Sequence, residues 1–225
     1  MCGRLSLTVP PEALEDRFSA SPPPALEPCY NVAPGEDLAA IRNDDRGRID
    51  LLEWGLVPSW ADDPGSGHIN ARAETVAEKP SFRDAYENRR CLVLADGYYD
   101  WADERGRGSQ PYRFTRTDGE PFAMAGIWER RESPEEVRRT VAILTTEPNA
   151  VVEPIHHRMP VILDRNEEGQ WLDGEPTEGL LDPYPEVDLR AYPVSDAVND
   201  PSNDSPAVIE EVDPPEQTGL EEFTG

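Results

Sequence analysis

The second residue of the chain would carry two nucleophiles once the initiator methionine is removed. The chain begins Met1-Cys2-Gly3-Arg4, and Cys is small enough at position two to allow removal of Met1. A mature N-terminal Cys2 would hold a free α-amine beside its thiol, with reference pKa values of about 7.7–8.0 and about 8.5. The amine can form an imine with an aldehyde, and the thiol can then close a thiazolidine ring. The alternative is that Cys2 is simply a small apolar residue of the core.

A second group of functional side chains lies in Asn70-Ala71-Arg72-Ala73-Glu74-Thr75. Asn70 could orient a nucleophile or a sugar oxygen, and Arg72 could bind a phosphate through two N–H groups. The same spacing suits the start of a helix, with Asn70 as the cap and Glu74 in the first turn. On spacing alone, the helix start is the favoured interpretation.

Two further stretches hold groups that could move protons. Asp100 follows two tyrosines and precedes Trp101, and aromatic neighbours would raise the pKa of its carboxyl. His156 and His157 are two of only three histidines, and histidine exchanges protons near neutral pH. The alternatives are an ordinary carboxylate and a surface pair of histidines. Because adjacent histidines without a partner at ligand spacing rarely converge on one ion, we expect no metal site.

Aromatic residues could also contact a nucleic acid. Trp54 and Trp60 lie in the stretch Trp54-Gly55-Leu56-Val57-Pro58-Ser59-Trp60, and either ring could stack on a base. Packing in the core is the alternative for a tryptophan.

Composition restricts the class of protein. The net charge is −25, with 46 acidic residues against 21 basic ones, and Lys79 is the single lysine. We interpret this balance as adaptation to molar salt, where the Debye length is about 3 Å and local arginines decide which ligands bind. Three cysteines without ligand spacing fit a reducing, cytoplasmic compartment. Because the first ten residues lack a long apolar run, we expect no signal peptide, and no apolar run of the sequence reaches membrane-spanning length.

Short apolar runs between turn residues predict an α+β fold. We expect a single domain over residues 1–212, built on a curved antiparallel sheet or open β-barrel with flanking short helices. The strands 111–116 and 121–130 are expected to form a hairpin across 117–120. The acidic residues 213–225 are expected to be disordered. The other expected strands are 38–42, 49–56, 91–95, 97–101, 137–146, 158–163 and 187–194, and the expected helices are 10–18, 74–78, 81–88, 164–172 and 177–181.

Taken together, these motifs resemble the SRAP family, the abasic-site-processing proteins also described as SOS-response-associated peptidases. The resemblance runs in order through nearly all of residues 2–212, and we expect a member of the salt-adapted, haloarchaeal-like type. The motifs that carry it are Met1-Cys2-Gly3-Arg4, Asn31-Val32-Ala33-Pro34, Trp54 to Trp60, Asn70 to Thr75, Arg90-Cys91-Leu92, Asp96 to Trp101, Ala125 to Glu129, His156 to Pro160, Val198-Asn199 and Asn203 to Pro206.

The resemblance implies a DNA-damage protein that links Cys2 covalently to the ring-opened aldehyde of an abasic site in single-stranded DNA. This is a lyase-like activity, with Asn70 orienting the Cys2 end and the sugar. Asp100 and His156 fall at the positions of the family's catalytic Glu and His. We expect a monomer without cofactor, metal or membrane partner. The residues expected to contact DNA are Arg4, Pro34, Trp54, Arg72 and Arg158.

The sequence departs from the family pattern at two positions, and two other functions remain open. Asp100 stands where Glu is usual, and His157 stands where Asp is common. An N-terminal-nucleophile amidohydrolase or peptidase would use the Cys2 thiolate with its own amine as base. A non-covalent single-strand-binding module would use Trp54 and the arginines. Family members remove a short leader when Cys does not follow Met, so we expect no leader for an autopeptidase activity to remove here.

Overall fold

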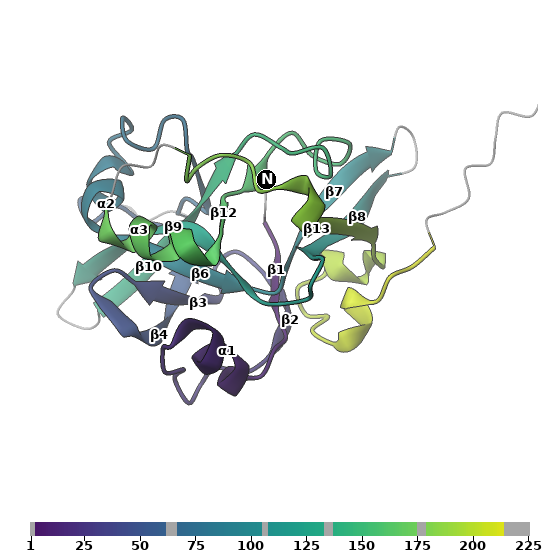
Figure 1. Cartoon of the computed structure of the whole chain (residues 1–225), viewed down its shortest axis with the longest axis horizontal. Helices are drawn as coiled ribbons and strands as arrows, with labels where there is room; N and C mark the ends of the chain where they lie inside the picture. The colour runs from purple at the N-terminus through teal and green to yellow at the C-terminus, as the bar shows by residue number, and fades with distance from the viewer. Residues whose placement is uncertain (1–2, 62–66, 105–107, 133–136, 175–178, 214–225) are drawn as a thin grey trace, which may run out of the picture.

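The structure is a computed structural model that describes residues 3–61, 67–104, 108–132, 137–174 and 179–213. This part of the chain forms two β-sheets and three short α-helices (Figure 1). The helices are α1 (Pro11–Phe18), α2 (Arg83–Asn88) and α3 (Arg165–Asp173). The strands are β1 (Leu5–Leu7), β2 (Cys29–Val32), β3 (Asp37–Arg42), β4 (Asp45–Trp54), β5 (Asn70–Arg72), β6 (Arg90–Ala95), β7 (Gly97–Glu104), β8 (Gly108–Arg116), β9 (Phe122–Glu132), β10 (Val137–Thr146), β11 (Met159–Pro160), β12 (Ile162–Leu163) and β13 (Leu189–Pro193).

Five strands of the larger sheet close into a barrel. The strands β4, β3, β6, β9 and β10 pair in that order, and β10 returns to pair with β4. The α+β prediction is therefore confirmed. The barrel is closed rather than open, and it is mixed because β10 runs parallel to β4. Closure removes the free strand edges that an open sheet would leave.

Both faces of the barrel strand β6 are buried, which explains its continuous apolar sequence. Every residue of Arg90–Ala95 is buried. Val93 belongs to one core cluster, and Leu94 belongs to another that includes Trp171 of α3. Trp171 also donates from Nε1 to the carbonyl of Cys91 at 2.9 Å. The helix α3 therefore covers β6, as Figure 1 shows.

The second sheet carries the N-terminal strand. Its order is β13-β8-β7-β1-β2, and every pair in it is antiparallel. The predicted hairpin is wrong, because β8 pairs with β7 and β13 whereas β9 pairs with β6, β10 and β12. The turn itself is present, with Gly119 at a φ of 75°. The chain therefore passes from one sheet to the other at residues 117–121.

Several helix predictions need adjustment. Residues 73–78 form turns instead of a helix, and so do residues 179–181. The predicted tail at 214–225 and the beginning of the predicted helix at 177–181 lie outside the described residues. Among the helices that the structure describes, none combines the length and apolarity needed to cross a membrane.

Candidate active site

Asn70 and Arg72 lie on a strand, so the alternative of a helix start is wrong. The strand β5 runs parallel to β10, with Asn70 opposite Ile143 and Arg72 opposite Thr145. Ala71 between them is 1% exposed and packs in the core. Since side chains alternate along a strand, Asn70 and Arg72 share the face opposite to Ala71. Asn70 is half-buried there and Arg72 is exposed.

Asp100 is a buried carboxylate on β7. It is 3% exposed, and its Oδ1 accepts a hydrogen bond from the backbone N–H of Trp101 at 3.1 Å. Burial raises the pKa of the Asp100 carboxyl, and the nearby His156 opposes this shift in part. A carboxyl with a raised pKa holds a proton closer to neutral pH, as a general acid must.

His156 lies beside Asp100 although the two are far apart in the sequence. Its Nδ1 is 3.5 Å from Oδ2 of Asp100. The backbone N–H of Arg158 donates to the same Nδ1 at 3.1 Å. The carbonyl oxygen of Arg158 also lies 3.1 Å from this Nδ1, so the backbone of Arg158 positions the ring beside Asp100. The structure therefore brings together two groups that could pass a proton.

Arg158 is held inside the protein by a charged partner. It is 8% exposed, and its Nη1 and Nη2 donate to Oε1 and Oε2 of Glu74 at 2.6 and 2.9 Å. Nη2 also donates to the carbonyl of Thr145 at 2.6 Å. Glu74 and Thr145 thus hold the two Nη groups of Arg158, while its Nε has no hydrogen-bond partner among the described residues, and direct contact of Arg158 with a DNA phosphate stays a prediction.

Arg4 is a half-buried arginine beside the Asp100 strand, and two of its nitrogens have no hydrogen-bond partner among the described residues. Its Nη2 donates to the carbonyl of Asn199 at 3.4 Å, while Nε and Nη1 are buried without a hydrogen-bond partner in the part of the chain that the structure describes. Burial lowers the pKa of Arg4, and nearby Glu36 is the largest influence that opposes this shift. The backbone carbonyl of Arg4 accepts from the N–H of Tyr99. Arg4 therefore lies opposite Tyr99, the residue that precedes Asp100 on β7.

A groove adjoins the histidine pair. It has a volume of about 600 Å³. The rings of His156 and His157 lie 4.3 Å apart between centroids, and electrostatic interaction with His156 lowers the pKa of His157. The residues that line the groove are Arg72, Glu147, Pro148, Asn149, Ala150, Glu153, His157 and Arg158.

Comparison with known proteins gives the family. Residues 1–201 match the family described as SOS response associated peptidase (SRAP). The chain belongs to the SRAP family. It is 40% identical over 222 residues to abasic site processing protein YoqW of Bacillus subtilis (strain 168), covering 93% of this chain and 99% of that protein. It is 36% identical over 188 residues to abasic site processing protein HMCES of Gallus gallus, covering 70% of this chain and 56% of that protein.

Solved structures share the SRAP architecture. A crystal structure of a Bacteroides thetaiotaomicron protein superimposes with a TM-score of 0.84 at 27% identity, covering 94% of this chain and 100% of that one. A Bordetella bronchiseptica protein gives a TM-score of 0.74 at 28% identity, covering 86% of this chain and 100% of that one.

The remaining predicted SRAP residues have different outcomes. Cys2 lies outside the described residues, so its role stays a prediction. Pro34 is exposed in the turn between β2 and β3. Trp54 was expected to stack on a base, but this assignment is wrong, because its side chain is 0% exposed and its Nε1 donates to the carbonyl of Ile69 at 2.9 Å. No group of three or more potential metal ligands converges within the described ranges.

Two supporting residues of the SRAP site were missed in the sequence. Glu74 was interpreted only as a possible first-turn acid, and its partnership with Arg158 has no local signal. The buried amide of Asn31 donates to the carbonyls of Val198, Asp200 and Asn203 at 3.3, 3.0 and 3.0 Å. The motif had marked Asn31 as part of a turn, whereas the side chain holds the C-terminal segment beside β2.

Proposed function

We propose that this protein recognises abasic sites in single-stranded DNA and forms a covalent crosslink to them through Cys2 after Met1 is removed. The pairing of Asp100 with His156 is the observation that most directly supports this function. The names of the relatives, abasic site processing proteins, point to the same substrate. We also infer that it acts as a monomer, in the cytoplasm where its substrate would lie.

The reaction begins with the opening of the abasic sugar. The bond between C1′ and O4′ breaks, O4′ takes up a proton and C1′ becomes an aldehyde carbon. The buried Asp100 carboxyl, whose pKa is raised, is suited to deliver that proton. His156 lies close enough to return a proton to Asp100.

The crosslink then forms in two steps without any change of oxidation state. The Cys2 amine attacks C1′, and the aldehyde oxygen leaves as water, giving an imine. The Cys2 thiol adds to C1′, and its proton moves to the nitrogen, which closes a five-membered thiazolidine. In this scheme Asn70 orients the amine and the sugar, while Arg4 and Arg72 hold phosphates beside the lesion.

The position of the chain start supports these roles. The strand β1 pairs antiparallel with β7, and Arg4 lies opposite Tyr99, next to Asp100. The guanidinium of Arg4 places a positive charge in this region of a protein whose net charge is −25.

The deciding experiment is a denaturing gel of the protein mixed with a single-stranded abasic oligonucleotide, without borohydride. The native chain should give a stable adduct, and Cys2→Ala should lose it while keeping at most an adduct that borohydride traps. An extra residue left before Cys2 should abolish both adducts, because the amine becomes an amide. Cys91→Ala is the matched control and should crosslink normally. A stable adduct on the Cys2→Ala protein would mean that another nucleophile reacts.

We also infer that the fold depends on high salt. The 46 acidic residues and the near absence of lysine create a large excess of like charge. Screening of that charge is the physical basis of the inference.

A further inference from the structure

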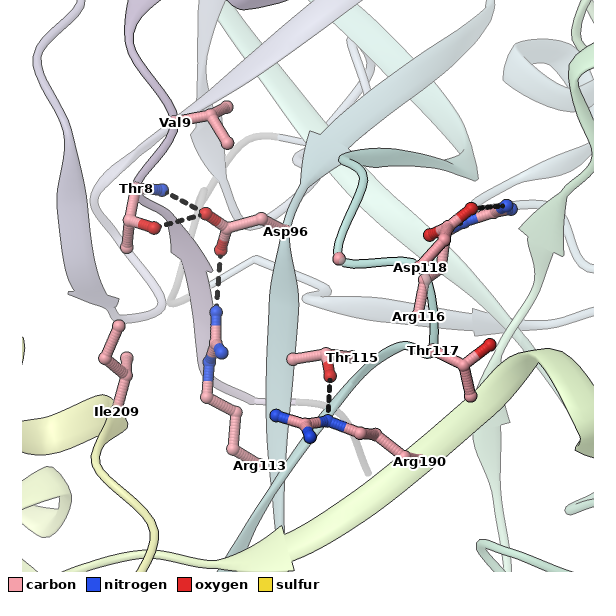
Figure 2. A pocket seen from close by; sticks show the side chains of 11 residues that line it. Thr8, Val9, Asp96, Arg113, Thr115, Arg116, Thr117, Asp118, Arg190 and Ile209 are labelled. Carbon is pink, nitrogen blue, oxygen red and sulfur yellow. Dashed lines mark hydrogen bonds and ion pairs between the residues drawn. The ribbon is translucent and has the colours of Figure 1, made fainter.

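A polar pocket lies on the opposite face of the second sheet from Asp100. Along the β7–β8 pair, Asp100 lies opposite Tyr112, whereas Tyr99 lies opposite Arg113. Neighbouring residues on a strand point to opposite faces, so Arg113 points away from the Asp100 face. The pocket has a volume of about 350 Å³. It is shown in Figure 2, and its polar lining consists mainly of Thr8, Asp96, Arg113, Thr115, Arg116 and Arg190.

Most charges of this pocket neutralise one another. Arg113 donates to Asp96 at 2.9 Å, and Thr8 donates to the other oxygen of Asp96 from its backbone N–H and its hydroxyl, both at 2.5 Å. Arg116 donates to both oxygens of Asp118 at 3.0 and 2.5 Å. These two pairs leave no net charge, so the charge of the pocket is decided by its remaining arginine.

Arg190 is that remaining cation; it is an exposed residue, and two contacts orient its side chain. Its Nε donates to the hydroxyl of Thr115 at 3.2 Å, and its guanidinium carbon lies 4.7 Å from the ring centroid of Tyr192. Its two Nη groups make no hydrogen bond or ion pair with any residue that the structure describes. Figure 2 shows the guanidinium pointing into the pocket, toward the side that Arg113 lines. A fixed guanidinium with two available amino groups matches the two oxygens of a carboxylate or phosphate.

The pocket offers a third donor and an apolar wall. Because the Thr115 oxygen accepts from Arg190, its own proton is free to donate to a ligand. Val9 and Ile209 also line the pocket, whose volume exceeds that of a bare anion. The pocket therefore suits an anionic group carried on a small organic body.

We propose that this pocket is a binding site for a small oxyanion, a phosphate or carboxylate held by the two Nη groups of Arg190 and the hydroxyl of Thr115. The site is separate from the crosslinking chemistry, since it lies on the other face of the sheet.

The test is NMR titration of the ¹⁵N-labelled full chain with inorganic phosphate and, separately, sodium acetate, at constant ionic strength. Saturable shifts at the amides of Thr117 and Ile209 are expected, and Arg190→Gln should weaken binding by about tenfold or more, as loss of a charged hydrogen bond does. Arg48→Gln is the matched control, since Arg48 has a side chain 64% exposed and lies outside the pocket.

Each outcome of the titration is decisive. Saturation by phosphate and not by acetate identifies a phosphate site, saturation by acetate and not by phosphate identifies a carboxylate site, and saturation by both identifies a general oxyanion site. Shifts that never saturate, or equal affinity in Arg190→Gln, would overturn the proposal and make Arg190 a solvated surface residue. Crosslinking to abasic DNA should be unchanged in Arg190→Gln, so this test does not depend on the outcome of the crosslinking experiment.

Discussion

Arg158 joins Glu74 to His156. The guanidinium of Arg158 contacts both oxygens of Glu74, and its backbone N–H donates to Nδ1 of His156. The carbonyl of Thr145 holds the same guanidinium from the barrel side. Through Arg158, Glu74 and the Thr145 carbonyl of β10 together anchor the loop that carries His156, although Glu74 itself need not touch the DNA.

We expect Glu74→Gln to slow crosslinking by about tenfold, because weaker anchoring of Arg158 leaves His156 less well oriented. The measurement is the single-turnover rate across pH 5 to 9, in which the pH dependence of the rate should also change. Glu78→Gln, a nearby exposed change, is the control. A Glu74→Gln protein with the native rate and the native pH profile would show that the ion pair has only a structural role.

Loss of either proton-transfer group should slow the reaction while DNA is still bound. We expect Asp100→Asn and His156→Ala each to reduce the crosslinking rate by about 10²–10⁴-fold, the usual effect of removing a general acid or base. Asp100→Glu should keep most of the rate, because it preserves the carboxyl. The rates are read from gels, and binding is read from fluorescence anisotropy with intact single-stranded DNA.

The control for this series is Asp182→Asn, which removes an exposed carboxylate elsewhere. If Asp100→Asn reacts at the native rate, a water molecule or His157 must supply the proton instead.

Burial of Asp100 should make stability depend on pH. Its pKa is raised in the folded state, so ionisation of this carboxyl opposes folding. The penalty is absent below the unfolded-state pKa of about 3.9 and is complete above the folded-state pKa. Asp100→Asn should therefore raise Tm at pH 8, by about 2–4 °C for each kcal/mol gained in a domain of this size. The gain should vanish near pH 4, and calorimetry at both values checks it. A gain of equal size at both pH values would contradict this account.

The fold should require salt. Removing salt lengthens the Debye length from about 3 Å at 1 M to about 30 Å at 0.01 M, so the excess negative charge repels itself across the molecule. Circular dichroism during dilution from molar to millimolar NaCl should show loss of structure. Sucrose in place of salt is the control, because it does not screen charge. A spectrum that stays the same throughout would refute the inference of salt adaptation.

Local sequence patterns predicted the strands and turns more accurately than they predicted which strands pair with one another. The apolar run Cys91–Ala95 predicted β6 nearly to the residue because both its faces are buried. The residues 117–120 predicted a turn, and a turn is present. However, the strands on either side belong to different sheets, since pairing is decided by distant strands. A hairpin signal is local, and it carries no information about these partners.

Local sequence patterns also could not show which residues meet at the candidate active site. The grouping of Asn70, Asp100 and His156 as one site came from the order of the motifs and not from the spacing of any one of them. The structure brings Asp100 and His156 together. The family resemblance and the aromatic ring of Trp54 led us to expect contact with DNA at Trp54 and Arg158. Their burial depends on Ile69 and Glu74, which no local spacing marks as partners.

Barrel closure has a consequence for how the protein folds. The strand pair that closes the barrel places Glu53 of β4 opposite Thr140 of β10, and a long stretch of chain separates these strands. Because the entropy of closing such a long loop is lost before the new contacts form, the β4–β10 pair should form late and slowly. Until then β4 and β10 each present an unpaired edge, and two incomplete barrels can pair with each other. Refolding yield should accordingly fall as protein concentration rises, even where the finished molecule is fully soluble.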